Sequence, residues 1–385
     1  MSLFQLLTLT PAFYMAAAVS FGVAVLLVLT KRLHGRFSMD GLVGIQKMHA
    51  HPTPRIGGLA IVAGVFAGYL LAQPESQAIL GTLLVAGLPA FVFGLAEDIT
   101  KKVSVMARLL ATMASGVLGW WLTGISLRGI DLPLMDHLLL WTPVSIAFTA
   151  FAVGGVANAV NIIDGFNGLA CGFVLIALVG LAAIAGATGD MNLALACLAI
   201  AGAMIGFWVV NWPLGKVFLG DGGSYFGGFA LAWACVLLIE RNPRISAFTP
   251  LLVCIHPVTE VLFSIYRRRM HGSHPGHPDR LHLHSLLMRR LVRPALHRLL
   301  PHDPRLAHTL RNPATGLLLA FITLPAIFVA FALRDHTGWA SLATLGFALG
   351  YVTIYARLVR FHWCSPITFL LTKPTQGLRV MRSPI

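Results

Sequence analysis

The sequence predicts an all-α polytopic membrane protein with about eleven transmembrane helices. Of its 385 residues, 57% are hydrophobic and only 11% are charged, and the mean hydropathy is +0.79. Soluble domains carry roughly 25% charged residues. The apolar residues are also grouped into runs of about 17–25, the length that crosses a bilayer as a helix. No soluble domain of useful size is left over, so we expect a single integral membrane domain over residues 1–385.

The expected spans follow one another with short connections. The first follows a stretch without Lys or Arg, unlike the charged n-region of a cleaved signal peptide, so we expect a retained helix. The third span ends in FGLAEDITKK, the fifth leads into NAVNIIDGFNGLA, and the seventh precedes FLGDGGSYFGG. The expected spans are 11–30, 56–72, 78–96, 105–124, 139–157, 170–187, 192–212, 224–240, 247–266, 314–333 and 338–357.

Positive charge is concentrated on one side of this predicted topology. With the N-terminus outside, all of the 28 Lys and Arg residues except Arg128, Arg241, Arg244 and Arg334 fall on one face. The positive-inside rule makes that face, and the C-terminus, cytoplasmic. The same positive charge suits anionic lipid headgroups. We therefore expect the protein to have a lipid bilayer as a partner, and we do not expect it to bind nucleic acid. The cytoplasmic segments are 31–55, 97–104, 158–169, 213–223, 267–313 and the basic tail 358–385.

The stretch NAVNIIDGFNGLA begins at the mouth of the fifth expected span. If the helix continues, Asn158, Asn161 and Asp164 fall on one stripe. An ionisable residue at the mouth of a membrane helix predicts a functional site. The alternative is that these side chains cap the helix or bond to neighbouring helices.

Three separate loops bring carboxylates to the cytoplasmic face. Glu97 and Asp98 follow the third span, Asp164 the fifth, and Asp221 the seventh. Converging carboxylates repel one another unless a cation lies between them. Oxygen ligands without a Cys₂His₂ pattern favour Mg²⁺ or Mn²⁺. We expect the glycines of FLGDGGS to let the backbone approach an anion or a metal-bound phosphate, although each acid alone could also be a helix cap.

Two basic motifs lie on the same face. In KMHAHPTPRIGG, Lys47 and Arg55 suit phosphate and the glycines permit close approach; the alternative is an ordinary basic flank. In HPGHPDRLHLHSLLMRR, the residues of interest are Arg280, His282 and His284. The motif contains no Cys, so it does not match the usual zinc-binding patterns well. We interpret this motif as a basic cluster facing carboxylates and phosphate, with an irregular basic loop as the alternative.

Taken in order, KxHxxPTPRIGG, GLxxDI, NxxNxxDGxNGLA, FLGDGGS and PDRxHxH resemble the polyprenyl-phosphate N-acetylhexosamine-1-phosphate transferases of glycosyltransferase family 4. This family contains the initiating enzymes for O-antigen, enterobacterial common antigen and teichoic acid, and is related to the lipid I synthase MraY. The likeness runs from about residue 31 to 290. PTPRIGG and PDRLHLH are similar to the WecA- and TagO-like branch.

The resemblance implies a transferase of the bacterial inner membrane with its active site on the cytoplasmic face. The implied reaction moves a sugar-1-phosphate from a UDP-activated N-acetylated sugar to undecaprenyl phosphate, and UMP leaves. It also implies a requirement for Mg²⁺, with Mn²⁺ as the alternative. The sugar, the glycan pathway and the oligomeric state, a homodimer included, are left open.

The resemblance also assigns roles to the acids and amides. Asp221 would be the principal metal ligand, with Asp98 close to it as the second. Asp164, Asn161 and Asn158 would hold the nucleotide-sugar and its diphosphate.

Three further residues are implied to bind substrate, and two positions depart from the family pattern. Phe218 would stack on uracil, and His282 and His284 would line the phosphate site. Glu97 replaces the first of two paired Asp residues; it keeps the charge and reaches one methylene further. Asn167 replaces the second Asp of DGxDG, so it can hydrogen-bond a uracil edge but cannot supply a charge.

The chemistry of the groups indicates electrostatic catalysis. A phosphate monoester has its second pKa near ~6, so the lipid phosphate is mostly dianionic and a general base has little to remove. The main difficulty is the repulsion between two polyanions, which Mg²⁺ and the cationic side chains must neutralise. We therefore expect Asp98 to support the metal more than to act as a base. Two other classes remain as alternatives: a lipid or solute transporter, and a metal-dependent lipid-diphosphate phosphatase that uses water.

Overall fold

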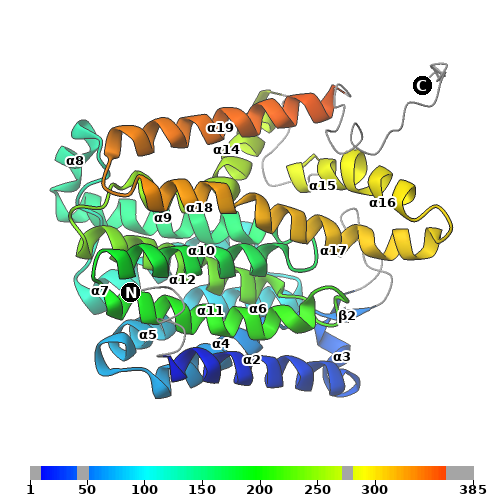
Figure 1. Cartoon of the computed structure of the whole chain (residues 1–385). Helices are drawn as coiled ribbons and strands as arrows, with labels where there is room; N and C mark the ends of the chain where they lie inside the picture. Colours follow the sequence, from blue (N-terminus) through cyan, green and yellow to red (C-terminus); the bar gives the residue numbers. More distant parts are fainter. Residues whose placement is uncertain (1–9, 41–51, 271–280, 361–385) are drawn as a thin grey trace.

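The computed structural model describes residues 10–40, 52–270 and 281–360 (Figure 1). Their helices lie side by side in one bundle, with α2 along one edge and α19 along the opposite edge. Strand structure within these residues is limited to an antiparallel pair, β1 (Met39–Asp40) with β2 (Thr53–Pro54). The predicted class, a mostly helical polytopic membrane protein, agrees with this architecture.

Eight helical segments in the described part of the chain are long and apolar enough to cross a membrane. A ninth is counted if α5 (Pro74–Ala86) and α6 (Leu88–Thr100), bent by 45°, form one span. The eight are α2 (Pro11–Leu29), α7 (Val105–Thr123), α9 (Thr142–Ile163), α10 (Leu169–Ala187), α11 (Met191–Asn211), α12 (Gly220–Arg241), α17 with α18 (Pro304–Ile322 and Leu324–Ala332) and α19 (Thr337–Val359).

Two predicted spans fall on shorter pieces. The prediction 56–72 corresponds to α4 (Gly58–Leu71), and 247–266 to α13 (Phe248–Val253) followed by α14 (Ile255–Met270). The count of eleven and the orientation therefore stay predictions. The remaining short elements are α3 (Lys31–Ser38), α8 (Pro133–Leu139), α15 (Leu283–Leu287), the π-helix η1 (Met288–Val292) and α16 (Arg293–Leu299).

Prolines explain where the bundle's helices break. A proline cannot donate to the carbonyl four residues before it, and its ring clashes with that carbonyl. Pro89, Pro257 and Pro325 have this relation to Val85, Val253 and Phe321. The helices α5, α13 and α17 end at or one residue after these positions.

The centre of the bundle is α12, whose apolar window is 94% buried. It packs against α6, α9, α10 and α4. Small residues allow helices to approach closely where no water drives them together. On the α2–α11 side, for example, a Cβ on Gly202 or Gly206 would clash with the Phe13 or Ala17 carbonyl oxygen. The C-terminal ends of α6 and α9 meet the N-terminal end of α12, which places the candidate site at one end of the bundle.

Candidate active site

Asp221, the second residue of α12, is the point where four segments converge. Its Oδ1 accepts hydrogen bonds from Arg55 Nη2 at 3.2 Å and from Asn161 Nδ2 at 3.1 Å. Its Oδ2 accepts one from Arg108 Nη1. Arg55 comes from the β2–α4 connection, Arg108 from the first turn of α7, and Asn161 from the end of α9. A carboxylate and two guanidinium groups thus share one half-enclosed position, where ion pairs are stronger than in water.

Asp98 holds the start of α12. Its Oδ1 and Oδ2 accept the backbone N–H groups of Asp221 and Gly222, both at 2.9 Å, and its side chain is only 1% exposed. The residue before α12 provides no side-chain cap. Asp98 therefore caps α12 from a different helix, where the helix dipole favours a negative charge. The contact fixes the direction of the Asp221 side chain, and the remaining lone pairs of Asp98 stay available to another cation.

Glu97 is directed elsewhere. Its Oε2 accepts the backbone N–H of Val103 at 2.8 Å, which closes the connection between α6 and α7. Of the two adjacent acids, Asp98 is the one whose carboxylate accepts hydrogen bonds from α12 within the described residues. Neighbouring helix positions differ by about 100°, which accounts for the two different directions.

The two asparagines at the end of α9 make different contacts. Asn161 donates to Asp221 and to Ser224 Oγ at 2.9 Å, so it belongs to the carboxylate cluster. Asn158 donates to Thr112 Oγ1 of α7 at 2.8 Å and to the Gly154 carbonyl of its own helix at 2.7 Å. The Asn158–Thr112 contact is a helix-to-helix hydrogen bond of the kind that the alternative interpretation of this stretch describes.

Asp164 directly follows α9, which ends one residue earlier than the predicted stripe requires. Its carboxylate accepts no hydrogen bond from any residue in the described ranges. Burial raises the pKa of Asp164 to about 7; the charge of Arg55 lowers this pKa and the charge of Asp221 raises it, each by less than burial does. Asp164 is thus a hydrogen-bond acceptor near Asp221 and Arg55. The described residues supply no donor for it.

The glycines of PTPRIGG and FLGDGGS bring these two segments together, and the expected approach of a phosphate at the same glycines stays a prediction. Gly58 N–H donates to the Leu219 carbonyl at 3.0 Å, and a Cβ on Gly58 would clash with Gly223 N. Gly220 has φ +74°, and a Cβ there would clash with the Arg55 carbonyl oxygen. Only glycine fits this backbone-to-backbone contact, and the contact places Arg55 over Asp221.

Phe218 and Asn167 lie in connections next to the carboxylates. Phe218 is half-buried and its N–H donates to the Pro54 carbonyl at 2.8 Å. Asn167 bonds away from the acids: its N–H donates to Asn312 Oδ1 at 2.8 Å and its Nδ2 to the Pro213 carbonyl at 3.4 Å. The uracil contacts proposed for both residues stay predictions, while Lys47 and Arg280 lie outside the described residues.

The HxH motif is anchored by an acid that the sequence analysis did not single out. His282 Nδ1 lies 2.9 Å from Glu260 Oε1, and Tyr351 donates its hydroxyl to Oε2 at 2.7 Å. Glu260 is on α14, inside the predicted span 247–266. An acid inside a membrane span is a strong indication of function, and that signal was available in the sequence. Arg108, inside the predicted span 105–124, carries the same signal.

The two histidines connect Glu260 to the Asp164 turn. The rings of His282 and His284 stack with centroids 5.2 Å apart, and His284 meets Phe166 edge-on at 5.4 Å. A Cβ on Gly165 would lie 3.1 Å from His284 Nε2, so the imidazole packs directly on this glycine. His284 therefore lies against the DGFNG turn that follows Asp164, while its predicted place in a phosphate site stays a prediction.

Several known proteins are similar in sequence to this chain over more than half of its length. The profile of Glycosyl transferase family 4 matches residues 80–239. The undecaprenyl-phosphate alpha-N-acetylglucosaminyl 1-phosphate transferase of Yersinia pestis is 30% identical over 249 residues, which are 63% of this chain and 68% of that protein. The chain belongs to this transferase family.

Two further members of the family support the same assignment. A probable undecaprenyl-phosphate N-acetylglucosaminyl 1-phosphate transferase of Bacillus subtilis is 26% identical over 318 residues, 81% of this chain and 82% of its own. The decaprenyl-phosphate N-acetylglucosaminephosphotransferase of Mycolicibacterium smegmatis is 29% identical over 275 residues, which are 63% of this chain and 66% of that protein. The family profile includes Asp98, Asp164 and Asp221, whereas Glu260 and the HxH motif lie beyond it.

The acids are a suitable donor set for the hard cation that the family resemblance implies. Within the described ranges, no three acidic, imidazole or thiol groups are grouped so as to hold a metal by themselves. Mg²⁺ commonly uses only one or two carboxylates, with substrate phosphates and water as the other ligands. Asp221 and Asp164 interact electrostatically and offer oxygen ligands only, which fits Mg²⁺ better than zinc.

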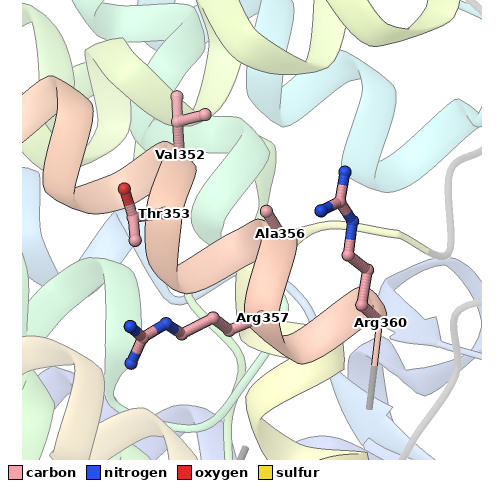
Figure 2. A pocket seen from close by; sticks show the side chains of 5 residues that line it. All are labelled: Val352, Thr353, Ala356, Arg357 and Arg360. Carbon is pink, nitrogen blue, oxygen red and sulfur yellow. The ribbon is translucent and has the colours of Figure 1, made fainter. Parts of the chain in front are cut away.

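A separate groove lies on α19, near the end of the described chain (Figure 2). It has a volume of about 390 Å³ and a mostly apolar lining. None of the predicted site residues in the described ranges lines it, so we do not count it as part of the candidate active site. Its lining residues are Val352, Thr353, Ala356, Arg357 and Arg360.

Proposed function

We propose that this protein transfers a sugar-1-phosphate from a UDP-activated N-acetylhexosamine to undecaprenyl phosphate in a bacterial inner membrane, releasing UMP. The observation that carries the proposal is the convergence of Asp98, Asp164 and Asp221 with Arg55 and Arg108 at one end of the bundle. The family profile matches residues 80–239, which contain all three carboxylates. The Yersinia pestis relative is named for a transfer of this kind.

The two arginines suit the charge problem of this reaction. Two phosphate-bearing substrates repel each other, and phosphoryl transfer depends on positioning and on cations that take up the developing charge. Arg55 and Arg108 are fixed by their ion pairs with Asp221, so their guanidinium groups need little rearrangement before substrate binds. Guanidinium groups also match phosphate oxygens in pairs.

We propose Mg²⁺ as the cofactor, with Mn²⁺ as the alternative. Asp221 would be the principal ligand of the ion and Asp98 the second, as the sequence predicts, and Asp164 lies near enough to Asp221 to be a further ligand. When bound, the ion would supply positive charge to the transferred phosphate and to departing UMP. Asp98 also fixes the N-terminus of α12, and through it the Asp221 carboxylate.

The orientation of the protein in the membrane is inferred from the basic residues at the same end of the bundle as the site. The carboxylates lie at the end of the bundle that carries Lys101, Lys102 and Arg267. The positive-inside rule makes that end cytoplasmic, where UDP-sugars are made. A phosphatase would release inorganic phosphate from the lipid instead of UMP, and a transporter would form no new lipid.

The test uses membranes that contain the protein, undecaprenyl phosphate and Mg²⁺, with UDP-GlcNAc, UDP-GalNAc and other UDP-sugars supplied one at a time. We expect one or more sugars to give a lipid whose mass equals undecaprenyl diphosphate plus the N-acetylated sugar minus one water, with an equal amount of UMP. Release of inorganic phosphate without this lipid would support the phosphatase, and consumption of no UDP-sugar would contradict the proposal.

A further inference from the structure

Glu260 is a buried acid with a full set of donors. It lies on α14, is 1% exposed, and accepts from three residues, two at the start of α15 and one on α19. The backbone N–H of Leu283 lies 3.2 Å from both carboxylate oxygens, His282 Nδ1 lies 2.9 Å from Oε1, and the Tyr351 hydroxyl donates to Oε2 at 2.7 Å. A carboxylate in such a place is retained at a cost in stability unless its partners compensate it.

These contacts determine which ring nitrogen of His282 carries hydrogen. The Leu283 N–H can only donate, and it shares both oxygens of Glu260. An ionised carboxylate only accepts, so His282 must present an Nδ1–H to it. The contact with Glu260 is made through Nδ1, and Nε2 lies on the other side of the ring.

The His282 ring is also linked to the acids of the active site. It stacks on His284, whose imidazole packs on Gly165, the residue after Asp164. A rotation of His282 would therefore displace His284 from the DGFNG turn. Glu260 is the group that prevents this rotation, because it bonds both the ring and the backbone of the residue that lies between the two histidines.

We propose that Glu260 is a positioning residue for the transfer reaction: it holds His282 as an Nδ1–H donor and aligns the stacked His282–His284 pair toward the substrate phosphates. This inference rests on the proposed function. Imidazole N–H groups bind phosphate oxygens strongly when the ring is charged. A purely structural role would require only that Glu260 joins α14, α15 and α19.

Glu260→Gln separates the two roles, because glutamine keeps the size and one acceptor oxygen but removes the charge. We expect kcat to fall about 10- to 100-fold, as for other partners that orient a functional imidazole, with KM for the UDP-sugar changed by less than about threefold. Glu260→Asp keeps the charge and should recover part of kcat. The matched control is Glu240→Gln, whose acid accepts Arg128 N–H at the far end of α12 and should leave kcat unchanged.

Chemical labelling gives a readout that does not depend on activity. Diethyl pyrocarbonate acylates accessible imidazoles, and peptide mass spectrometry locates each label. We expect His282 and His284 to be labelled faster in Glu260→Gln than in the wild type, with His308 unchanged. Faster labelling with unchanged kcat, or no change in either, would overturn the positioning role. An inactive wild type would instead refute the proposed function, and this inference with it.

Discussion

Two carboxylates at opposite ends of α10 have opposite surroundings. Asp190, beyond its C-terminal end, accepts from Arg241 Nε at 2.7 Å, Arg241 Nη2 at 2.8 Å and Leu193 N–H at 3.2 Å. Burial alone would raise the pKa of Asp190, but these hydrogen bonds outweigh it and the pKa is lowered. Asp164, before the N-terminal end, accepts no hydrogen bond from a described residue, and burial raises its pKa to about 7.

The difference distinguishes an acid that serves the fold from one that serves a ligand. Asp190 caps α11 and pairs with α12, so its charge stabilises the folded protein. Asp164 places a charge in a partly buried position where no described residue donates a hydrogen bond to it, which destabilises the folded protein. Such an acid is expected at a site where a substrate or a cation provides the missing partner.

The largest effect is expected for Asp221→Asn. Asparagine cannot neutralise Arg55 and Arg108, and it offers a metal one neutral oxygen instead of a carboxylate. We expect transfer to fall at least about 100-fold, as when a group fixed for transition-state charge is removed. The measurement is product formation in membranes with equal amounts of inserted protein. Near wild-type activity at saturating Mg²⁺ would exclude Asp221 as the central acid.

The second prediction compares the adjacent acids of α6. Asp98→Asn replaces one acceptor of the α12 cap by an amide N–H, so an N–H of Asp221 or Gly222 loses its partner. We expect about a 10-fold or larger loss of transfer, since an unpaired buried donor costs about 1–3 kcal/mol. Glu97→Gln should stay within about threefold, because its amide oxygen still accepts the Val103 N–H. Equal losses, or recovery of Asp98→Asn at high pH, would contradict the capping role.

The third prediction concerns pH and Asp164. Because its pKa is about 7 in the folded protein and 3.8 ordinarily, the folded state binds more protons between these values. The free energy of unfolding therefore falls as pH rises through this window. Asp164→Asn removes that loss, so its Tm in detergent should gain on the wild type from pH 5 to pH 8 while transfer is lost. A constant Tm difference would show that Asp164 is compensated in the fold.

The smallest effect is expected for Asp190→Asn. Asparagine remains a good N-cap for α11, so the main loss is the ion pair with Arg241, whose guanidinium group is partly exposed, and the pair is worth on the order of 1 kcal/mol. Transfer should be unchanged and Tm slightly lower, with the difference reduced at high salt. Loss of transfer without loss of Tm would remove the distinction between the two ends of α10.

The sequence predicts the class of fold and the positions of most helices from composition and run length. It does not predict where the helices break. Proline positions explain the breaks at Pro89, Pro257 and Pro325, but a proline near the start of a helix is equally compatible with a continuous, kinked span. Run length therefore overestimates the number of long helices, as the split of 247–266 into α13 and α14 illustrates.

The sequence also indicates the acids of the site but not how they divide the work. Sidedness alone groups Asp98, Asp164 and Asp221. Which of them caps a helix and which lacks donors depends on contacts between residues far apart in the chain, such as Asp98 with Gly222. The position of Glu260 inside a predicted span is visible in the sequence, but its partners, His282 and Tyr351, are not, because they come from two other segments.

Exchange of labelled UMP into UDP-sugar tests the central claim most directly, because only transfer with UMP as leaving group runs in this reverse direction. Membranes carrying the lipid-linked product are incubated with labelled UMP and Mg²⁺, using wild type, Asp164→Asn and Asp190→Asn. We predict labelled UDP-sugar with wild type and Asp190→Asn, and none with Asp164→Asn. No exchange with any of them, or equal exchange with all three, would contradict a sugar-1-phosphate transfer site at the end of α9 and α12.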